Sequence, residues 1–278
     1  MALRPRQLSV TEIETWLTDP YAIYARHVLR LEALDPLEQT TDAADYGSLV
    51  HAALHAFWKE AAASWPADPA GRLSAIMDRT LRKAGLRPAL EAWWSPRLAR
   101  IADWVAAAET ERRSAWPAKL VATEVRGKWA FDCPGGFLLR GRADRIERGA
   151  DGGLAILDYK TGSVPTRKQV ESGLAPQLLL EAAMAAEEAF GPDFAAPATE
   201  LAYWRLTGGF EPGKACPLFG SDAANIAEAV TAARQGLREL IAKFDDPACP
   251  YLAQPHPGLA VRASPYAQLA RIADWAAA

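Results

Sequence analysis

Two aspartates and a lysine lie on neighbouring segments in an arrangement that could bind a metal ion. Asp144 belongs to GFLLRGRADRIER, while Asp158 and Lys160 belong to LAILDYKTG, and the composition of each segment predicts a strand. Residues 149–153, GADGG, are typical of a hairpin loop between the two strands. The antiparallel register set by that loop places Asp144 opposite Asp158. Because like charges in opposed positions repel, another group must compensate them.

The same register pairs Ile146 with Ile156 and Arg142 with Lys160 on the face that carries the aspartates. In one interpretation, Arg142 and Lys160 each pair diagonally with an aspartate of the other strand, and such surface pairs contribute only about 0–1 kcal/mol. In the other, a divalent cation lies between the carboxylates. The isoleucine pair predicts a mostly buried sheet, where ion pairs rarely recover their desolvation cost, and carboxylate oxygens suit Mg²⁺ or Mn²⁺. The second interpretation is favoured, with the lysine stabilising charge on a phosphate.

The composition limits the kinds of protein this chain can be. Its 278 residues, 50% hydrophobic and 23% charged, can bury a sizeable core. The sequence lacks the run of about 20 apolar residues that a membrane span needs, and it begins without a secretion signal, so we expect a cytoplasmic protein. The net charge of -3 gives no overall basic field. Nucleic-acid binding would therefore need a local patch or a partner.

Helices are predicted on the N-terminal side of the hairpin. Ser9 and Glu12 have the spacing of a capping box, and Pro20 divides the first segment into two short helices. A further helix is predicted over residues 48–63, directly after Gly47. The region from about 65 to 117, rich in Ala, Arg, Leu and Trp, is expected to be a helical elaboration.

From residue 118 onward the pattern changes to a small sheet with flanking helices. Besides the hairpin and the strand 119–131 before it, the sequence predicts helices at 176–190 and 221–244 and a strand at 199–207. This order indicates an α/β (α+β) fold. We expect a single domain, residues 1–278, with the helical elaboration at 65–117, a core at 118–245 and a tail at 246–278.

An aspartate that ends one strand, followed by Asp-x-Lys on the next, resembles the PD-(D/E)XK nuclease superfamily. The RecB-like branch of that superfamily adds a Gly-x-x-x-His helix upstream and a Gln-led helix downstream. Residues 47–51 (GSLVH) match the first, and Gln177 begins the second. The segments LSVTEIETWLTDPYAIYARHVLRL and YAQLARIADW further resemble the C-terminal nuclease domains of the AddB family of helicase/nuclease subunits.

The resemblance implies a restriction-endonuclease-like fold and a Mg²⁺- or Mn²⁺-dependent deoxyribonuclease of exonuclease type. It implies that His51, Asp144, Asp158 and the backbone carbonyl of Tyr159 hold the metal, and that Lys160 places or activates the attacking water. Gln177 is expected to help position DNA. The implied setting is double-strand-break repair on single-stranded DNA ends, with an AddA-like helicase as partner. Because AddB proteins carry a large helicase-like region before this domain, the chain is expected to be an excised domain or the product of a split gene.

The sequence departs from the family at two places. Many relatives have a tyrosine four residues after the glutamine that begins the downstream helix, where this chain has Glu181. Many also bind an iron–sulfur cluster through four cysteines, but Asp19 occupies the first of those positions and Cys249 is the one cysteine in the C-terminal region. We therefore expect no cluster, which also disfavours a Cas4-like nuclease. The rival function is a catalytically silent module that guides DNA or assembles with a helicase.

Four other features favour ordinary explanations. His55 is predicted to be a half-buried histidine, since HAALH lacks the glutamate of a zinc protease helix. Residues 208–216, GGFEPGKAC, approach a phosphate-binding loop but lack its Ser/Thr, and a loop is predicted there. Glu124 could be an extra acid near the metal, although an exposed strand glutamate is the preferred interpretation. The ten tryptophans are expected in the core and at interfaces.

Overall fold

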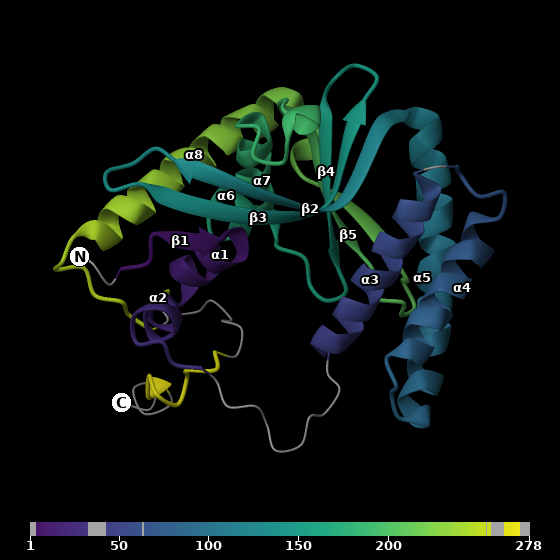
Figure 1. The fold of residues 1–278 in the computed structure, drawn as a ribbon, viewed down its shortest axis with the longest axis horizontal. Coiled ribbons are helices and arrows are strands. Elements are labelled where there is room, and N and C mark those ends of the chain that lie inside the picture. Colours follow the sequence, from purple (N-terminus) through teal and green to yellow (C-terminus); the bar gives the residue numbers. More distant parts are fainter. Residues whose placement is uncertain (1–3, 33–42, 63, 254, 257–263, 273–278) are drawn as a thin grey trace.

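A mixed sheet lies at the centre of the fold, with helices packed on both of its faces (Figure 1). The computed structural model describes residues 4–32, 43–62, 64–253, 255–256 and 264–272. The strands are β1 (Gln7–Ser9), β2 (Ala118–Phe131), β3 (Phe137–Gly149), β4 (Leu154–Lys160), β5 (Ala198–Arg205) and β6 (Lys214–Pro217). The α-helices are α1 (Val10–Thr18), α2 (Pro20–Ile23), α3 (Ala43–Ala61), α4 (Pro69–Lys83), α5 (Pro88–Ala115), α6 (Arg167–Glu171), α7 (Gln177–Ala186) and α8 (Ala223–Asp245). Shorter turns of π-helix (Tyr24–Val28) and 3-10 helix (Pro192–Phe194 and Phe219–Ser221) connect some of them.

Strand β3 organises the sheet, because three other strands pair with it. β2 runs antiparallel along one edge of β3. On the other edge, β1 pairs parallel with residues 138–140, and β4 pairs antiparallel with residues 145–148. β5 then adds parallel to β4, and β6 antiparallel to β5. The predicted α/β fold, a small mixed sheet flanked by helices, is confirmed.

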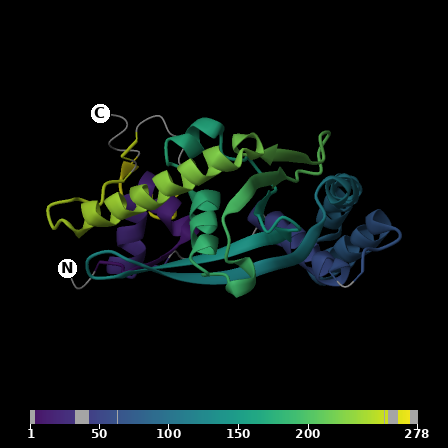
Figure 2. The ribbon, with the colours of Figure 1, turned by 90° about the horizontal axis from the view of Figure 1, so that it is seen from above.

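Two hydrophobic cores lie on opposite faces of the sheet, and β4 contributes to both. Leu154 and Ile156 pack with α1, α7 and α8, whereas Ala155 and Leu157 pack with α3, α4 and α5. Successive side chains of a strand point to opposite faces, so this apolar strand is covered on both sides. Figure 2 shows α8 running along one face and the α3–α5 group at the far end of the sheet.

The local sequence signals fixed several elements correctly. The Ser9 side chain accepts a hydrogen bond from the Glu12 N–H at 3.2 Å, and the Ser9 N–H donates to Glu12 Oε2 at 2.7 Å, so the capping box is confirmed. Pro20 begins α2 as predicted. The hairpin loop at 149–153 is also confirmed, since the Gly149 N–H donates to the Gly153 carbonyl at 3.0 Å.

Other expectations need correction. α3 begins at Ala43, four residues before Gly47. β6 occupies the end of the segment 208–216, which was predicted to be a loop, and β1 was not predicted. Both strands are short, and their pairing with β3 and β5 depends on tertiary contacts rather than on local sequence. Residues 254, 257–263 and 273–278 of the predicted tail lie outside the described residues, and the proposed division of the domain stays a prediction.

Among the described residues, no helix combines the length and the apolar run that crossing a bilayer requires.

Candidate metal centre

The site lies where one edge of β3 changes partner. β1 pairs with residues 138–140 and β4 with residues 145–148, so among the described strands residues 141–144 face a gap on this edge. The predicted register is confirmed over Arg145–Leu157 and Ile146–Ile156, but the ladder ends one pair before Asp144 and Asp158. Instead, the Tyr159 N–H donates to Asp144 Oδ2 at 2.8 Å. A side chain thus replaces the next backbone rung, and the two strands separate here.

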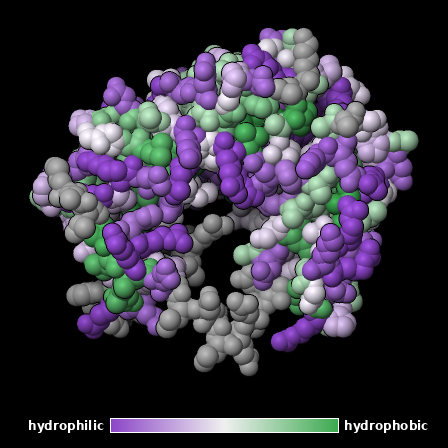
Figure 3. Space-filling view, in the orientation of Figure 1, coloured by the Kyte–Doolittle hydropathy of each residue, from purple (hydrophilic) through white to green (hydrophobic). Residues whose placement is uncertain are grey.

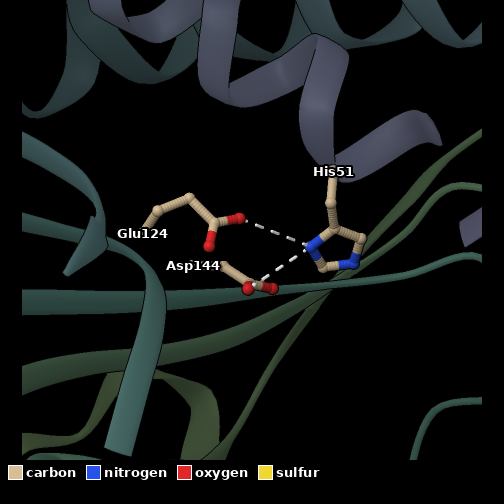
Figure 4. Close-up of side chains that lie close together, drawn as sticks. All are labelled: His51, Glu124 and Asp144. Carbon is tan, nitrogen blue, oxygen red and sulfur yellow. Dashed lines mark ion pairs between the residues drawn. The ribbon is translucent and has the colours of Figure 1, made fainter. Parts of the chain in front are cut away.

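His51, Glu124 and Asp144 converge from three different elements, α3, β2 and β3 (Figure 4). One potential ligand atom from each residue lies within 4.8 Å of the others. His51 Nδ1 is 3.3 Å from Asp144 Oδ1 and 4.0 Å from Glu124 Oε1. Two hard carboxylate oxygens and an imidazole nitrogen form a donor set that suits a divalent cation.

The ring of His51 is oriented by β4. Its Nε2 lies 2.9 Å from the Tyr159 carbonyl oxygen, and its ring packs edge-on against the Tyr159 ring at 6.0 Å. Since a carbonyl only accepts hydrogen bonds, Nε2 carries the proton and Nδ1 faces the carboxylates. α3 approaches β4 closely: a Cβ on Gly47 would lie 3.1 Å from Thr161 Oγ1. The Gly-x-x-x-His spacing therefore has a packing reason, because the glycine lets the first turns of α3 pass the end of β4.

The orientation of the His51 ring indicates whether a cation would fit between its Nδ1 and the two carboxylates. A neutral imidazole would point the Nδ1 lone pair at two carboxylates, which is repulsive unless a proton or a metal ion lies between them. Burial disfavours the charged ring, but the hydrogen bond and charge of Asp144, with Asp158 and Glu124, outweigh it and raise the pKa of His51. The site is therefore built to hold positive charge, and the residues present fit a divalent cation.

Glu124 is the residue that the sequence interpretation undervalued. Its side chain is 15% exposed, so the expected exposed position is wrong. β2 pairs Thr123 with Arg145 and Val125 with Ala143, so the strand pleat puts Glu124 on the same face as Asp144. Its φ of 55° lies in the left-handed region, which is costly for a residue other than glycine and concentrates at functional sites. Arg142 donates a hydrogen bond to the Glu124 carboxylate.

Asp158 belongs to a second, neighbouring group. Its Oδ2 pairs with Lys160 Nζ at 2.8 Å, and its Oδ1 accepts a hydrogen bond from Gln177 Nε2 at 2.5 Å. Lys160 Nζ also donates to Gln177 Oε1 at 2.9 Å, and Gln177 Nε2 donates to Glu181 Oε1 at 3.2 Å. An ammonium only donates and a carboxylate only accepts, so the two partners fix the orientation of the Gln177 amide.

Burial dominates the electrostatics of this second group. It raises the pKa of Asp158 to about 6, with Lys160 opposing the shift and Asp144 adding to it. Burial, together with the charges of Asp158 and Asp144, also holds the pKa of Glu181 well above its usual range. Burial alone would lower the pKa of Lys160, but the charge and hydrogen bond of Asp158 raise it. Lys160 is therefore held as an ammonium beside an acid that readily takes a proton.

The predicted site residues thus divide into two adjacent groups. In the first group, His51 Nδ1 faces Asp144 and Glu124, and His51 Nε2 faces the Tyr159 carbonyl. Asp158, Lys160 and Gln177 form the other group, and their proposed roles at a metal or at DNA stay predictions. The diagonal ion-pair lattice is wrong. Arg142 pairs with Glu124 and Lys160 with Asp158, because the hairpin strands separate before these pairs form.

The remaining candidates have structural roles. His55 Nδ1 lies 2.8 Å from the Thr123 hydroxyl oxygen, which supports its interpretation as a half-buried histidine. In the segment 208–216, a Cβ on Gly213 would lie 2.2 Å from the Trp104 ring, so this glycine is required by packing. Glu181 is 2% exposed and contacts the Gln177 amide rather than solvent.

Comparisons with known proteins identify a family that this chain matches. Residues 7–258 match the family model of the PD-(D/E)XK nuclease superfamily. An uncharacterised protein of Rickettsia bellii is 32% identical over 187 residues, and the match covers 67% of this chain and 22% of that protein. Uncharacterised protein RC0550 of Rickettsia conorii is 32% identical over 191 residues, covering 67% of this chain and 23% of its own length. The matched region therefore spans about a fifth of these curated relatives.

A solved structure titled as that of SSO0001 aligns with 84% of this chain and 76% of its own chain. It is 13% identical, with a TM-score of 0.32.

Proposed function

This chain belongs to the PD-(D/E)XK nuclease superfamily, and we propose that it is a Mg²⁺- or Mn²⁺-dependent nuclease that hydrolyses phosphodiester bonds in DNA. The observation that carries the proposal is the convergence of His51 Nδ1 with the Glu124 and Asp144 carboxylates at the gap beside β3. These three donors would hold the ion, and the Tyr159 carbonyl, also predicted as a ligand, would orient the imidazole by accepting a hydrogen bond from His51 Nε2 on the other side of the ring. A divalent ion bound there would polarise a phosphodiester oxygen and lower the pKa of water.

The second group of residues would act on the substrate through Lys160. Asp158 and the Gln177 amide hold the Lys160 ammonium from two sides, so its position is fixed before substrate arrives. An ammonium in this position would stabilise negative charge that develops on the phosphate or orient the attacking water. In this proposal Asp158 completes the metal ligands when substrate is bound, and Gln177 is chiefly a positioning residue, because its buried amide already bonds Asp158 and Lys160.

The finer proposal concerns substrate and partner. We infer an exonuclease acting on single-stranded DNA ends in double-strand-break repair, in the cytoplasm, as the nuclease domain of an AddB-like protein with an AddA-like helicase. The support is the likeness of residues 8–31 and 266–275 to AddB nuclease domains. The length of the Rickettsia relatives, of which the matched region is about a fifth, is compatible with a domain of a larger protein.

Cleavage of labelled single-stranded DNA in Mg²⁺ or Mn²⁺ tests the proposal. We expect His51→Ala, Asp144→Asn, Asp158→Ala and Lys160→Ala each to lower the rate by about 10²-fold or more, as for removal of other groups that stabilise transition-state charge. His55→Ala is the matched control, because it removes an imidazole one turn away that contacts Thr123. Equal rates in wild type and in the Asp158 and Lys160 variants would refute the assignment.

A silent guiding or assembly module is the competing function. It predicts no cleavage and no Mn²⁺ binding that depends on the carboxylates of Glu124 and Asp144. Mn²⁺ titration by electron paramagnetic resonance, with wild type and Asp144→Asn side by side, separates the two functions. Saturable binding that Asp144→Asn removes would favour the nuclease, and identical titrations of the two proteins would favour the module.

A further inference from the structure

Four basic side chains continue the face of the sheet that carries the candidate metal centre. β2 and β3 pair Arg126 with Arg142 and Lys128 with Arg140. Both pairs lie on the face of Glu124 and Asp144, since side chains two residues apart on a strand share a face. Counted from Glu124 and Asp144, the first basic row is Arg126 and Arg142, and the second row is Lys128 and Arg140.

Three of these four cations have no acidic partner among the described residues. Arg142 pairs with Glu124, but among the described residues the side chains of Arg126, Lys128 and Arg140 form no ion pair or hydrogen bond. All four are exposed. Like charges placed directly opposite each other across two strands destabilise the pairing, so this arrangement costs stability unless an anion lies over it.

The basic rows also line a groove. A cavity of about 640 Å³ is bordered by all four cations, by Thr11 at the start of α1, and by Gln177 at the start of α7. It therefore extends from Gln177, a member of the second group of site residues, over the basic rows. Figure 3, in the orientation of Figure 1, shows hydrophilic side chains across the middle of the molecule above a hollow.

We propose that these two basic rows form a track that binds the backbone of one DNA strand. The strand would pass the second row, then the first, and reach the candidate metal centre. The inference rests on the proposed nuclease function. Its support is the spacing: the rows are two residues apart on extended strands, roughly 7 Å, and they lie at successive steps from the acidic cluster. That step is similar to the separation of neighbouring phosphates along a stretched strand.

The width of the track favours a single strand over a duplex. Directly paired side chains on neighbouring strands are only about 5 Å apart, so the track can follow one line of phosphates. A duplex presents two backbones separated by grooves of about 6 and 12 Å, and its second backbone would lie beyond the track. The track also explains how a chain with a net charge of -3 could bind DNA, because the positive charge is local.

The test measures binding of a fluorescent oligothymidylate in EDTA, where no metal-dependent cleavage occurs, over a series of salt concentrations. We expect the triple variant Arg126→Ala, Lys128→Ala, Arg140→Ala to bind about tenfold more weakly at low salt. The slope of log K against log salt should fall by about 0.7 for each cation removed, or roughly 2 in all. The matched control is Arg82→Ala, Lys83→Ala, Arg87→Ala, which removes three exposed cations from the α4–α5 hairpin and should leave the slope unchanged.

A second probe replaces the phosphates of the oligonucleotide by neutral methylphosphonates. Wild type should bind this probe more weakly than the charged one, and this difference should be much smaller in the triple variant. A triple variant with the slope of wild type, or a control variant that loses as much, would overturn the track, even if wild type cleaves DNA. Equal loss of binding to a blunt duplex would overturn the single-strand assignment. If the triple variant loses binding while wild type fails to cleave in Mn²⁺, the track stands and the nuclease function fails.

Discussion

Asp144 and Arg145 are neighbours in sequence, but they belong to two charged clusters of opposite design on the two faces of β3. Arg145 is fully buried beneath α5, where it bonds Glu109 at 2.9 Å and also contacts Glu147. Its guanidinium carbon lies 3.8 Å from the centre of the Trp58 ring. Asp144 lies instead at the gap between β1 and β4, where it meets His51 and Glu124.

The buried cluster balances its charges. Arg112, Arg113 and Arg145 pair with Glu109, Glu147 and Glu200, at distances that include 2.8 Å for Arg112–Glu147 and 2.7 Å for Arg112–Glu200. Burial alone would raise the pKa of Glu147, but Arg145 and Arg112 outweigh it and lower that pKa. This cluster holds α5 against the sheet and needs no further ion.

In the gap beside β3, acids outnumber fixed cations. Glu124, Asp144, Asp158 and Glu181 lie together with Arg142 and Lys160. The pKa of Asp158 is raised to about 6, chiefly by burial, whereas that of Glu147 is lowered. The pKa of Glu147 is lowered because the cations of its cluster outweigh burial. The pKa of Asp158 is raised because burial and Asp144 outweigh Lys160, so a bound cation would stabilise that group.

Arg145→Met should give the largest effect on folding. It removes the central cation of the buried cluster and leaves Glu109 and Glu147 undercompensated, so we expect a loss of about 3–5 kcal/mol in the free energy of unfolding. Urea unfolding followed by circular dichroism measures it. The control is Arg126→Ala, an exposed cation, with an expected change within about 0.5 kcal/mol. A loss below about 1 kcal/mol in Arg145→Met would show that the cluster does not hold the helical face in place.

Mn²⁺ should stabilise the protein through the candidate metal centre at His51, Glu124 and Asp144, and not through the buried cluster around Arg145. Binding to the folded state contributes about 2.7 kcal/mol when the free ion is at 100 times its dissociation constant. We expect Asp144→Asn to lose this gain, because it removes a ligand, and Glu200→Gln to keep it, because it neutralises a carboxylate of the balanced cluster. Urea unfolding at increasing Mn²⁺ measures the gain, and equal stabilisation of both variants would contradict the comparison.

The strand registers that place the charged residues of both clusters could be predicted from the sequence. The GADGG loop fixed the register of β3 and β4, because hairpin length and side-chain alternation are local properties. The same reasoning applied to DCPGG, residues 132–136, would have paired Phe131 with Phe137 and placed Glu124 beside Asp144. The signal for Glu124 was therefore present in the sequence.

Other features of the site depend on tertiary packing. The hairpin ladder ends where the Asp144 side chain binds the Tyr159 N–H, and β1, which pairs farther along the same edge of β3, is too short to give a clear pattern. Asp158 bonds Gln177 because of how α7 packs across β4, which no local rule sets. The alternation of residues 144–148 predicts two faces, but only the placement of α5 makes the Arg145 face a buried cluster.

The smallest expected effect is on the acid limb of the stability curve, through Glu147 of the balanced cluster. The folded-state pKa of Glu147 lies below its ordinary value of about 4.3, so its ion pairs contribute stability that is fully present above that value. This contribution is lost as pH falls through the lower, folded-state pKa. The stability difference between wild type and Glu147→Gln should therefore shrink as pH decreases from 6 to the acid range in urea unfolding. Asp103→Asn, which neutralises an exposed carboxylate on α5, should give a small difference at every pH. A difference for Glu147→Gln that stayed constant with pH would mean that charge on Glu147 does not stabilise the buried cluster.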